Sequence, residues 1–177
     1  MKTATFFIAA ALSASVMQAQ SITAELKNQW EGIKGNVLKA AERMPDADFK
    51  FKPEGEPRTF ADLVTHIADA HMGMCGAASG EMKKVDAASK TTKADVVAAL
   101  KESIAFCDAA YAGLNDGNVS STVKMFGRDT TKFSALNFNV IHDNEVYGSM
   151  AVYYRLKNIV PPSTADRPAM GGGKKKE

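Results

Sequence analysis

Three histidines are the side chains of this sequence best suited to metal binding or proton transfer: His66, His71 and His142. Glu145 follows His142 by three residues, a spacing that places both side chains on one face of a helix. A histidine and a carboxylate spaced in this way can bind one metal ion, as they do inside some helical bundles. The alternative is a hydrogen-bonded core histidine with Glu145 at the solvent edge, and spacing alone favours this alternative.

Other kinds of site lack support in the sequence. Hydroxyl groups near the histidines, Thr65 and Ser149, have no nucleophile elbow or triad around them. No glycine-rich phosphate loop precedes a predicted helix. The chain has 22 basic and 20 acidic residues, a net charge of +2, which provides no basic surface for nucleic acid. We therefore expect no nucleic-acid partner.

Four amphipathic helices must position these residues. Apolar side chains recur every three to four positions over each segment, and prolines, glycines or polar runs separate the segments. Thr59 with Asp62 forms a capping-box pattern at the start of the second segment. Residues 118–132 contain no convincing strand pair and are predicted to be a long connection. The sequence predicts an all-α four-helix bundle with helices over residues 22–44, 59–82, 92–114 and 133–158.

The second predicted helix separates its two histidines. Its apolar strip runs through Ile67 and His71, whereas His66 lies about 120° away around the helix. Periodicity alone therefore predicts that His71 is the buried histidine. Asp69, one turn from His66, either orients that ring or is a solvated surface acid, and the surface role is favoured.

The two cysteines, Cys75 and Cys107, lie on the second and third predicted helices. If these helices are parallel, both cysteines lie at nearly the same height; if antiparallel, their heights differ by about 9 Å at 1.5 Å per residue. We predict a Cys75–Cys107 disulfide or at least a close contact. A disulfide would indicate a parallel pair.

The N-terminus has the pattern of a secretory signal peptide. Lys2 precedes an uncharged apolar run, Phe6 to Val16, and small and polar residues surround a cleavage point near Ala19. The run is shorter than the roughly 20 apolar residues that span a bilayer. Residues 1–19 are predicted to direct export, so the mature protein is periplasmic or secreted and is not stably inserted in the membrane. The bundle then covers residues 20–162, and residues 163–177 are predicted to be a disordered tail.

Two segments of the chain resemble the DinB-like superfamily. Residues 49–53 (FKFKP) and 58–69 (RTFADLVTHIAD) are similar to the segment around that family's first metal histidine. Residues 142–148 (HDNEVYG), with VYYRL at 152–156 and IVPP at 159–162, resemble the family's closing motif. The resemblance covers nearly all of the mature chain.

The resemblance implies an up-down-down-up bundle in which the second and third helices are parallel. Many family members bind a divalent metal, zinc or nickel among others, on three histidines. His66 and His142 match two of these ligands, but Val146 occupies the third place and has no donor atom. Either Glu145 completes a site of two histidines and one carboxylate, or metal binding has been lost. His71 is kept as a reserve ligand.

Two functional hypotheses remain at this stage. The first is an exported metal-binding protein, a metal-dependent transferase or hydrolase, with Tyr147 and Arg155 as conceivable substrate contacts. Family members with known activities include thiol-dependent S-transferases and a maleylpyruvate isomerase. The second is a non-catalytic bundle that binds a small molecule or another protein. The sequence does not decide whether the protein is an enzyme, and it leaves a homodimer open.

Overall fold

The structure, a computed structural model, describes residues 21–56 and 58–168. The predicted signal peptide, residues 1–19, lies outside the described residues. Four long helices dominate the molecule, as the sequence predicts, and a hairpin and several short helical turns connect them. The long helices are α1 (Ile22–Arg43), α2 (Phe60–Ser79), α3 (Lys93–Ala112) and α4 (Lys132–Leu156).

Each long helix begins at a hydroxyl side chain that accepts a hydrogen bond from a backbone N–H of the first turn: Ser21, Thr59, Thr92 and Thr131. At α2 the predicted capping box forms, with Asp62 accepting from the Thr59 N–H in return. The same helix ends at Gly80, whose φ of 81° is the left-handed conformation that glycine adopts at helix ends. These local signals place His66 and His71 on one continuous helix.

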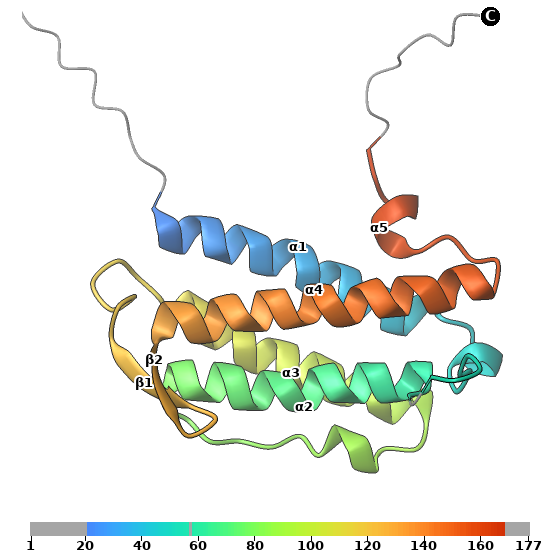
Figure 1. Cartoon of the computed structure of the whole chain (residues 1–177), viewed down its shortest axis with the longest axis horizontal. Helices are drawn as coiled ribbons and strands as arrows, with labels where there is room; N and C mark the ends of the chain where they lie inside the picture. The colour runs from blue at the N-terminus through green and yellow to red at the C-terminus, as the bar shows by residue number, and fades with distance from the viewer. Residues whose placement is uncertain (1–20, 57, 169–177) are drawn as a thin grey trace, which may run out of the picture.

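The helices form an up-down-down-up bundle, which confirms the predicted fold. In Figure 1, α1 and α4 run in one direction and α2 and α3 in the other. A crossover from Gly80 to Thr92, containing η2 (Ala87–Ser89), returns along the bundle so that α3 can start beside the beginning of α2. As a result α2 lies against both α3 and α4. No helix of residues 21–56 and 58–168 is long and apolar enough to cross a membrane.

A β-hairpin precedes α4, so the prediction of an irregular connection over residues 118–132 is wrong. Strands β1 (Thr122–Met125) and β2 (Arg128–Thr131) pair antiparallel through a two-residue turn at Phe126 and Gly127. Both turn residues have positive φ, 50° and 78°, as in a type I′ turn. Asn, Asp and Gly usually precede glycine in such turns. Phenylalanine in that position concealed the hairpin signal.

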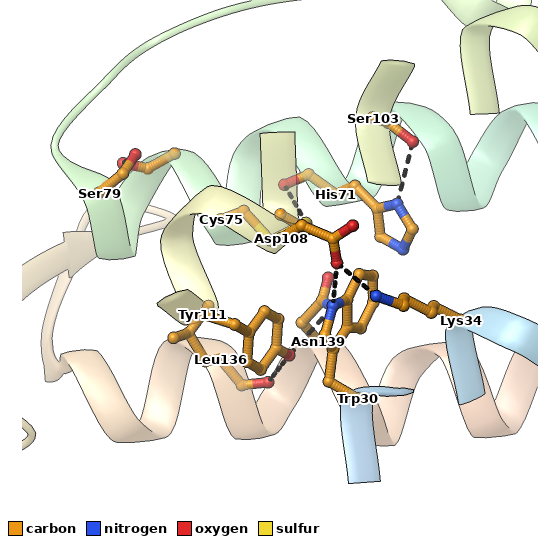
Figure 2. Close-up of a disulfide and its surroundings, with 12 residues drawn as sticks. Trp30, Lys34, His71, Cys75, Ser79, Ser103, Asp108, Tyr111, Leu136 and Asn139 are labelled. Atoms are coloured by element: carbon orange, nitrogen blue, oxygen red, sulfur yellow. Dashed lines mark hydrogen bonds and ion pairs between the residues drawn. A yellow bond between two sulfur atoms is a disulfide. The ribbon is translucent and has the colours of Figure 1, made fainter. Parts of the chain in front are cut away.

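A disulfide joins Cys75 on α2 to Cys107 on α3, as predicted, with the Cα atoms 5.2 Å apart. One turn earlier on each helix, His71 on α2 hydrogen bonds to Ser103 on α3 (Figure 2). Both pairs are separated by 32 residues in the sequence. Since the offset stays constant along the helices, α2 and α3 are parallel and aligned in register.

The segment after α4 packs on the bundle. A short helix, α5 (Pro162–Ala165), is followed by Asp166, whose carboxylate forms ion pairs with Lys39 and Arg43 of α1. These ion pairs and their hydrogen bonds hold the pKa of Asp166 at about 2. The predicted disorder beyond Ser163 therefore does not apply to the residues up to Asp166, while residues 169–177 lie outside the described part of the chain.

Candidate functional site

His66 of α2 and His142 of α4 face each other across the groove between the two helices. Their Nε2 atoms are 3.0 Å apart and the two rings meet edge to face. Both side chains are half-buried rather than enclosed; 14% of the His142 side chain is exposed. The predicted meeting of these two histidines, 76 residues apart in the chain, is thus found in the structure.

This spacing suits two ligands of one ion as well as a hydrogen bond. Nitrogen atoms about 2.0–2.1 Å from one metal ion lie roughly 2.9 Å apart at a right angle and about 3.4 Å apart in a tetrahedron. The observed 3.0 Å falls within this range. Within the described residues, however, no group of three His, Cys, Asp or Glu side chains is arranged to hold a metal ion. The structure therefore presents two histidine donors.

The surroundings of His66 favour its neutral form. Burial lowers the pKa of His66 below the ordinary value of 6.5, and the nearby Arg58 and His142 lower it further, against the opposite influence of Asp69 and Asp143. A metal ion binds only the neutral imidazole. His66 is thus kept in the state that coordination requires at neutral pH.

We expect the lowered pKa of His66 to make the metal-free protein sensitive to mild acid. As the pH falls below 6.5, the unfolded chain binds a proton at this residue that the folded protein still refuses, so folding stability decreases until the pH passes the lower, folded-state pKa. Urea unfolding between pH 7.5 and 5 measures the loss. His66→Asn should reduce the decrease over this range, and an equal decrease in the variant would contradict the assignment to His66.

Glu145 does not join the two histidines in the structure. It is exposed on α4, as are Ser149, Val152 and Leu156 of the same stripe. The expectation that this stripe faces the bundle interior is wrong. The buried face of α4 is centred about 100° further round, near Asp143, and it includes polar residues that find partners inside the core. Apolar periodicity misplaced the face because buried polar residues and exposed apolar residues both lie on this helix.

Val146, in the place of the third family histidine, is buried at 7% exposure. It lies one turn after His142 on the inner side of α4. The position expected to lack a donor therefore points into the protein, as predicted.

His71 is fully buried, as periodicity predicts, but it cannot serve as the reserve ligand. Its Nδ1 lies 3.0 Å from Ser103 Oγ and its Nε2 lies 2.8 Å from Asp143 Oδ2, so both ring nitrogens are engaged. Sequence analysis missed Asp143 and Ser103. The signal available was an aspartate directly after His142, on the side of α4 that the neighbouring apolar residues bury.

Three other residues have structural roles. Asp69 accepts hydrogen bonds from the backbone N–H groups of Ala87 and Ala88, so it anchors the crossover and neither orients His66 nor stays merely solvated. The Tyr147 hydroxyl accepts a hydrogen bond from the backbone N–H of Ser163. Arg155 donates to a carbonyl one turn earlier on α4. None of the three projects toward the histidine pair through these contacts.

Comparisons with known proteins agree with this architecture. A family model of the DinB superfamily matches residues 29–148. The crystal structure of a DinB-like protein from Bacillus cereus is similar with a TM-score of 0.65 and 18% identity, covering 81% of this chain and 97% of that one. A DinB-like protein from Bacillus subtilis is similar with a TM-score of 0.60 and 18% identity, covering 76% and 92%. No curated protein matches this chain.

Proposed function

The chain belongs to the DinB superfamily, and from this premise we propose that it binds a divalent metal ion, zinc or nickel, between His66 and His142. The observation that carries the proposal is the 3.0 Å separation of the two Nε2 atoms on different helices. The lowered pKa of His66 supports it, because protons then compete less with a metal ion. Two ligands from rigid helices require little rearrangement on binding.

Glu145 is the side chain that we propose as the third donor. It is exposed, and it lies three residues after His142 on the same helix, so its carboxylate can approach the pair by side-chain rotation alone. A bound ion with open positions would supply Lewis-acid activation of water or a thiol, the chemistry of a metal-dependent hydrolase or transferase.

A cavity beside α4 offers room for a small molecule. It measures about 250 Å³ and is lined by Ser149, Val152 and Tyr153 of α4 and by Glu54 and Glu56 of the preceding loop. Ser149 lies one turn after Glu145. We propose this cavity as the place of a small-molecule ligand, because it adjoins the third donor on the same helix.

We also propose that the protein works in the periplasm or outside the cell. The export signal at Lys2 and Phe6 to Val16 supports this location. The disulfide between Cys75 and Cys107 supports it too, because such bonds persist in oxidising compartments. Transfer reactions that use cytosolic small thiols are for this reason a poor guide to the substrate.

Metal binding is tested with Zn²⁺ and Ni²⁺ by calorimetry and by elemental analysis of protein purified without chelator. We expect one ion per chain, and a loss of affinity of at least about 100-fold, or about 2.7 kcal/mol, in His66→Ala and His142→Ala. Glu145→Ala should weaken binding, whereas Glu102→Ala, a control at an exposed position of α3, should not. Val146→His should strengthen binding about tenfold or more by adding a donor.

The outcome separates the two hypotheses left open by the sequence. If neither ion binds the wild-type protein while it remains folded, the metal proposal fails. The bundle would then be a non-catalytic protein that uses its cavities for small ligands or a partner, consistent with Val146 at the third ligand position.

A further inference from the structure

A row of polar side chains crosses the core from α3 through α2 to α4 and ends at His142. Ser103 Oγ lies 3.0 Å from His71 Nδ1, and His71 Nε2 lies 2.8 Å from Asp143 Oδ2. Ser103, His71 and Asp143 are each 0% exposed. The second carboxylate oxygen, Asp143 Oδ1, lies 3.5 Å from His142 Nδ1. Figure 2 shows the α2–α3 part of this row, with His71 directed at Ser103 beside the disulfide.

The hydrogen bonds of this row fix the charge of His71. The Ser103 hydroxyl donates to the carbonyl oxygen of Leu100, so its oxygen accepts from the Nδ1–H of His71. The Asp143 carboxylate has no proton to give and accepts from Nε2–H. His71 therefore donates from both nitrogens and is an imidazolium. It compensates the charge of Asp143 inside the core.

Asp143 stays ionised for the same reason. Burial by itself would raise the pKa of Asp143, but the charge of His71 and the proximity of His142 outweigh it and hold the pKa below the ordinary value. A carboxylate with one oxygen on His71 has its other oxygen free to accept.

Two polar atoms at the end of the row lack partners. His142 Nδ1 and Asp143 Oδ1 are both buried, and neither has a hydrogen-bond partner among the described residues. At 3.5 Å they face each other slightly beyond hydrogen-bond length. A shift of a few tenths of an ångström pairs them, since the ionised carboxylate can only accept and an Nδ1–H can donate.

We propose that Asp143 is a positioning residue that holds His142 in the tautomer protonated at Nδ1, so that the Nε2 lone pair faces His66. His71 and Ser103 anchor the carboxylate for this task. In the metal-free protein His66 then donates its Nε2–H to His142 Nε2 across the 3.0 Å contact. The inference rests on the proposed metal site for its use, because the lone pair on His142 Nε2 is the one that a metal ion would share.

The substitution Asp143→Asn gives a specific expectation. The amide oxygen must accept from the Nε2–H of His71, which turns the amide nitrogen toward His142. An amide nitrogen only donates, so His142 must now accept at Nδ1 and carry its proton on Nε2. The variant should invert the tautomer and weaken Zn²⁺ binding by about 10- to 100-fold, as loss of such supporting groups does.

The experiment records long-range ¹H–¹⁵N correlations of the histidines in ¹⁵N-labelled, metal-free protein, and then the Kd for Zn²⁺ by calorimetry. We expect Nδ1–H at His142 in the wild type and Nε2–H in Asp143→Asn. Asp69→Asn is the matched control, because that carboxylate holds the crossover and should leave the tautomer unchanged.

Wild-type His142 with its proton on Nε2, or the same tautomer in wild type and Asp143→Asn, would overturn the proposal. The wild-type spectrum decides the matter even if the variant fails to fold. Because the spectrum is recorded without metal, an absence of Zn²⁺ binding would refute the proposed metal site and leave the positioning role of Asp143 to be judged on the tautomer alone.

Discussion

Replacing His71 with leucine should lower the free energy of unfolding by about 3 to 5 kcal/mol, the usual cost of removing one partner of a buried ion pair. The variant leaves the Asp143 carboxylate in the core without its cation, and it deprives Ser103 of a donor. Both His71 and Asp143 are fully buried, so water cannot replace the lost contacts without opening the bundle. Guanidinium unfolding of the metal-free protein measures the difference.

A second variant separates the charge from the packing. Removing both partners, in His71→Leu with Asp143→Ala, should recover part of the loss because no uncompensated charge remains. His66→Leu is a control on the same helix: its ring is half-buried and forms no ion pair with a carboxylate among the described residues, so the expected change is within about 1 kcal/mol. A His71→Leu protein as stable as wild type would show that the buried pair contributes nothing.

Removing the disulfide should cost about 3 to 4 kcal/mol in the chain-entropy model, given the 32 residues between Cys75 and Cys107. The expected result is a lower midpoint of chemical unfolding in the double variant Cys75→Ala, Cys107→Ala than in the oxidised wild type. The crossover, which the bond closes into a loop, gains the most freedom in the unfolded chain.

Reductant supplies the control for this prediction. Dithiothreitol should bring the wild type close to the double variant and should leave the variant unchanged, because the variant has no bond to reduce. If oxidised and reduced wild-type protein unfold at the same denaturant concentration, the bond does not stabilise the bundle.

Most of the fold could be predicted from the sequence because its signals are local. Hydroxyl caps at Thr59 and Thr92 and the proline after α1 mark helix ends, and they act within one turn. The height of the cysteines, argued from residue counts alone, anticipated the disulfide. The hairpin before α4 escaped because Phe126 occupies a left-handed position that its residue type disfavours.

The candidate site was predictable only in part, because its members are brought together by packing between helices. Family resemblance, not periodicity, identified His66, since its half-buried place at the flank of α2 resembles that of many surface residues. The burial of Asp143 depends on the distant His71 to compensate its charge, and no pattern within α4 indicates such a partner. For the same reason Glu145 was given to the wrong side of α4.

The constant 32-residue offset between α2 and α3 has a consequence for assembly. Small side chains such as Ala78 and Ala110 are buried on these parallel helices, and such smooth surfaces can dock in several alignments that differ by one turn, about 5.4 Å. A slip of one turn would set Cys107 opposite His71 and strand Cys75 without a partner. The sulfur atoms can bond only in the native alignment. Oxidation thus acts as proofreading: it traps correctly aligned chains and lets misaligned ones dissociate and try again.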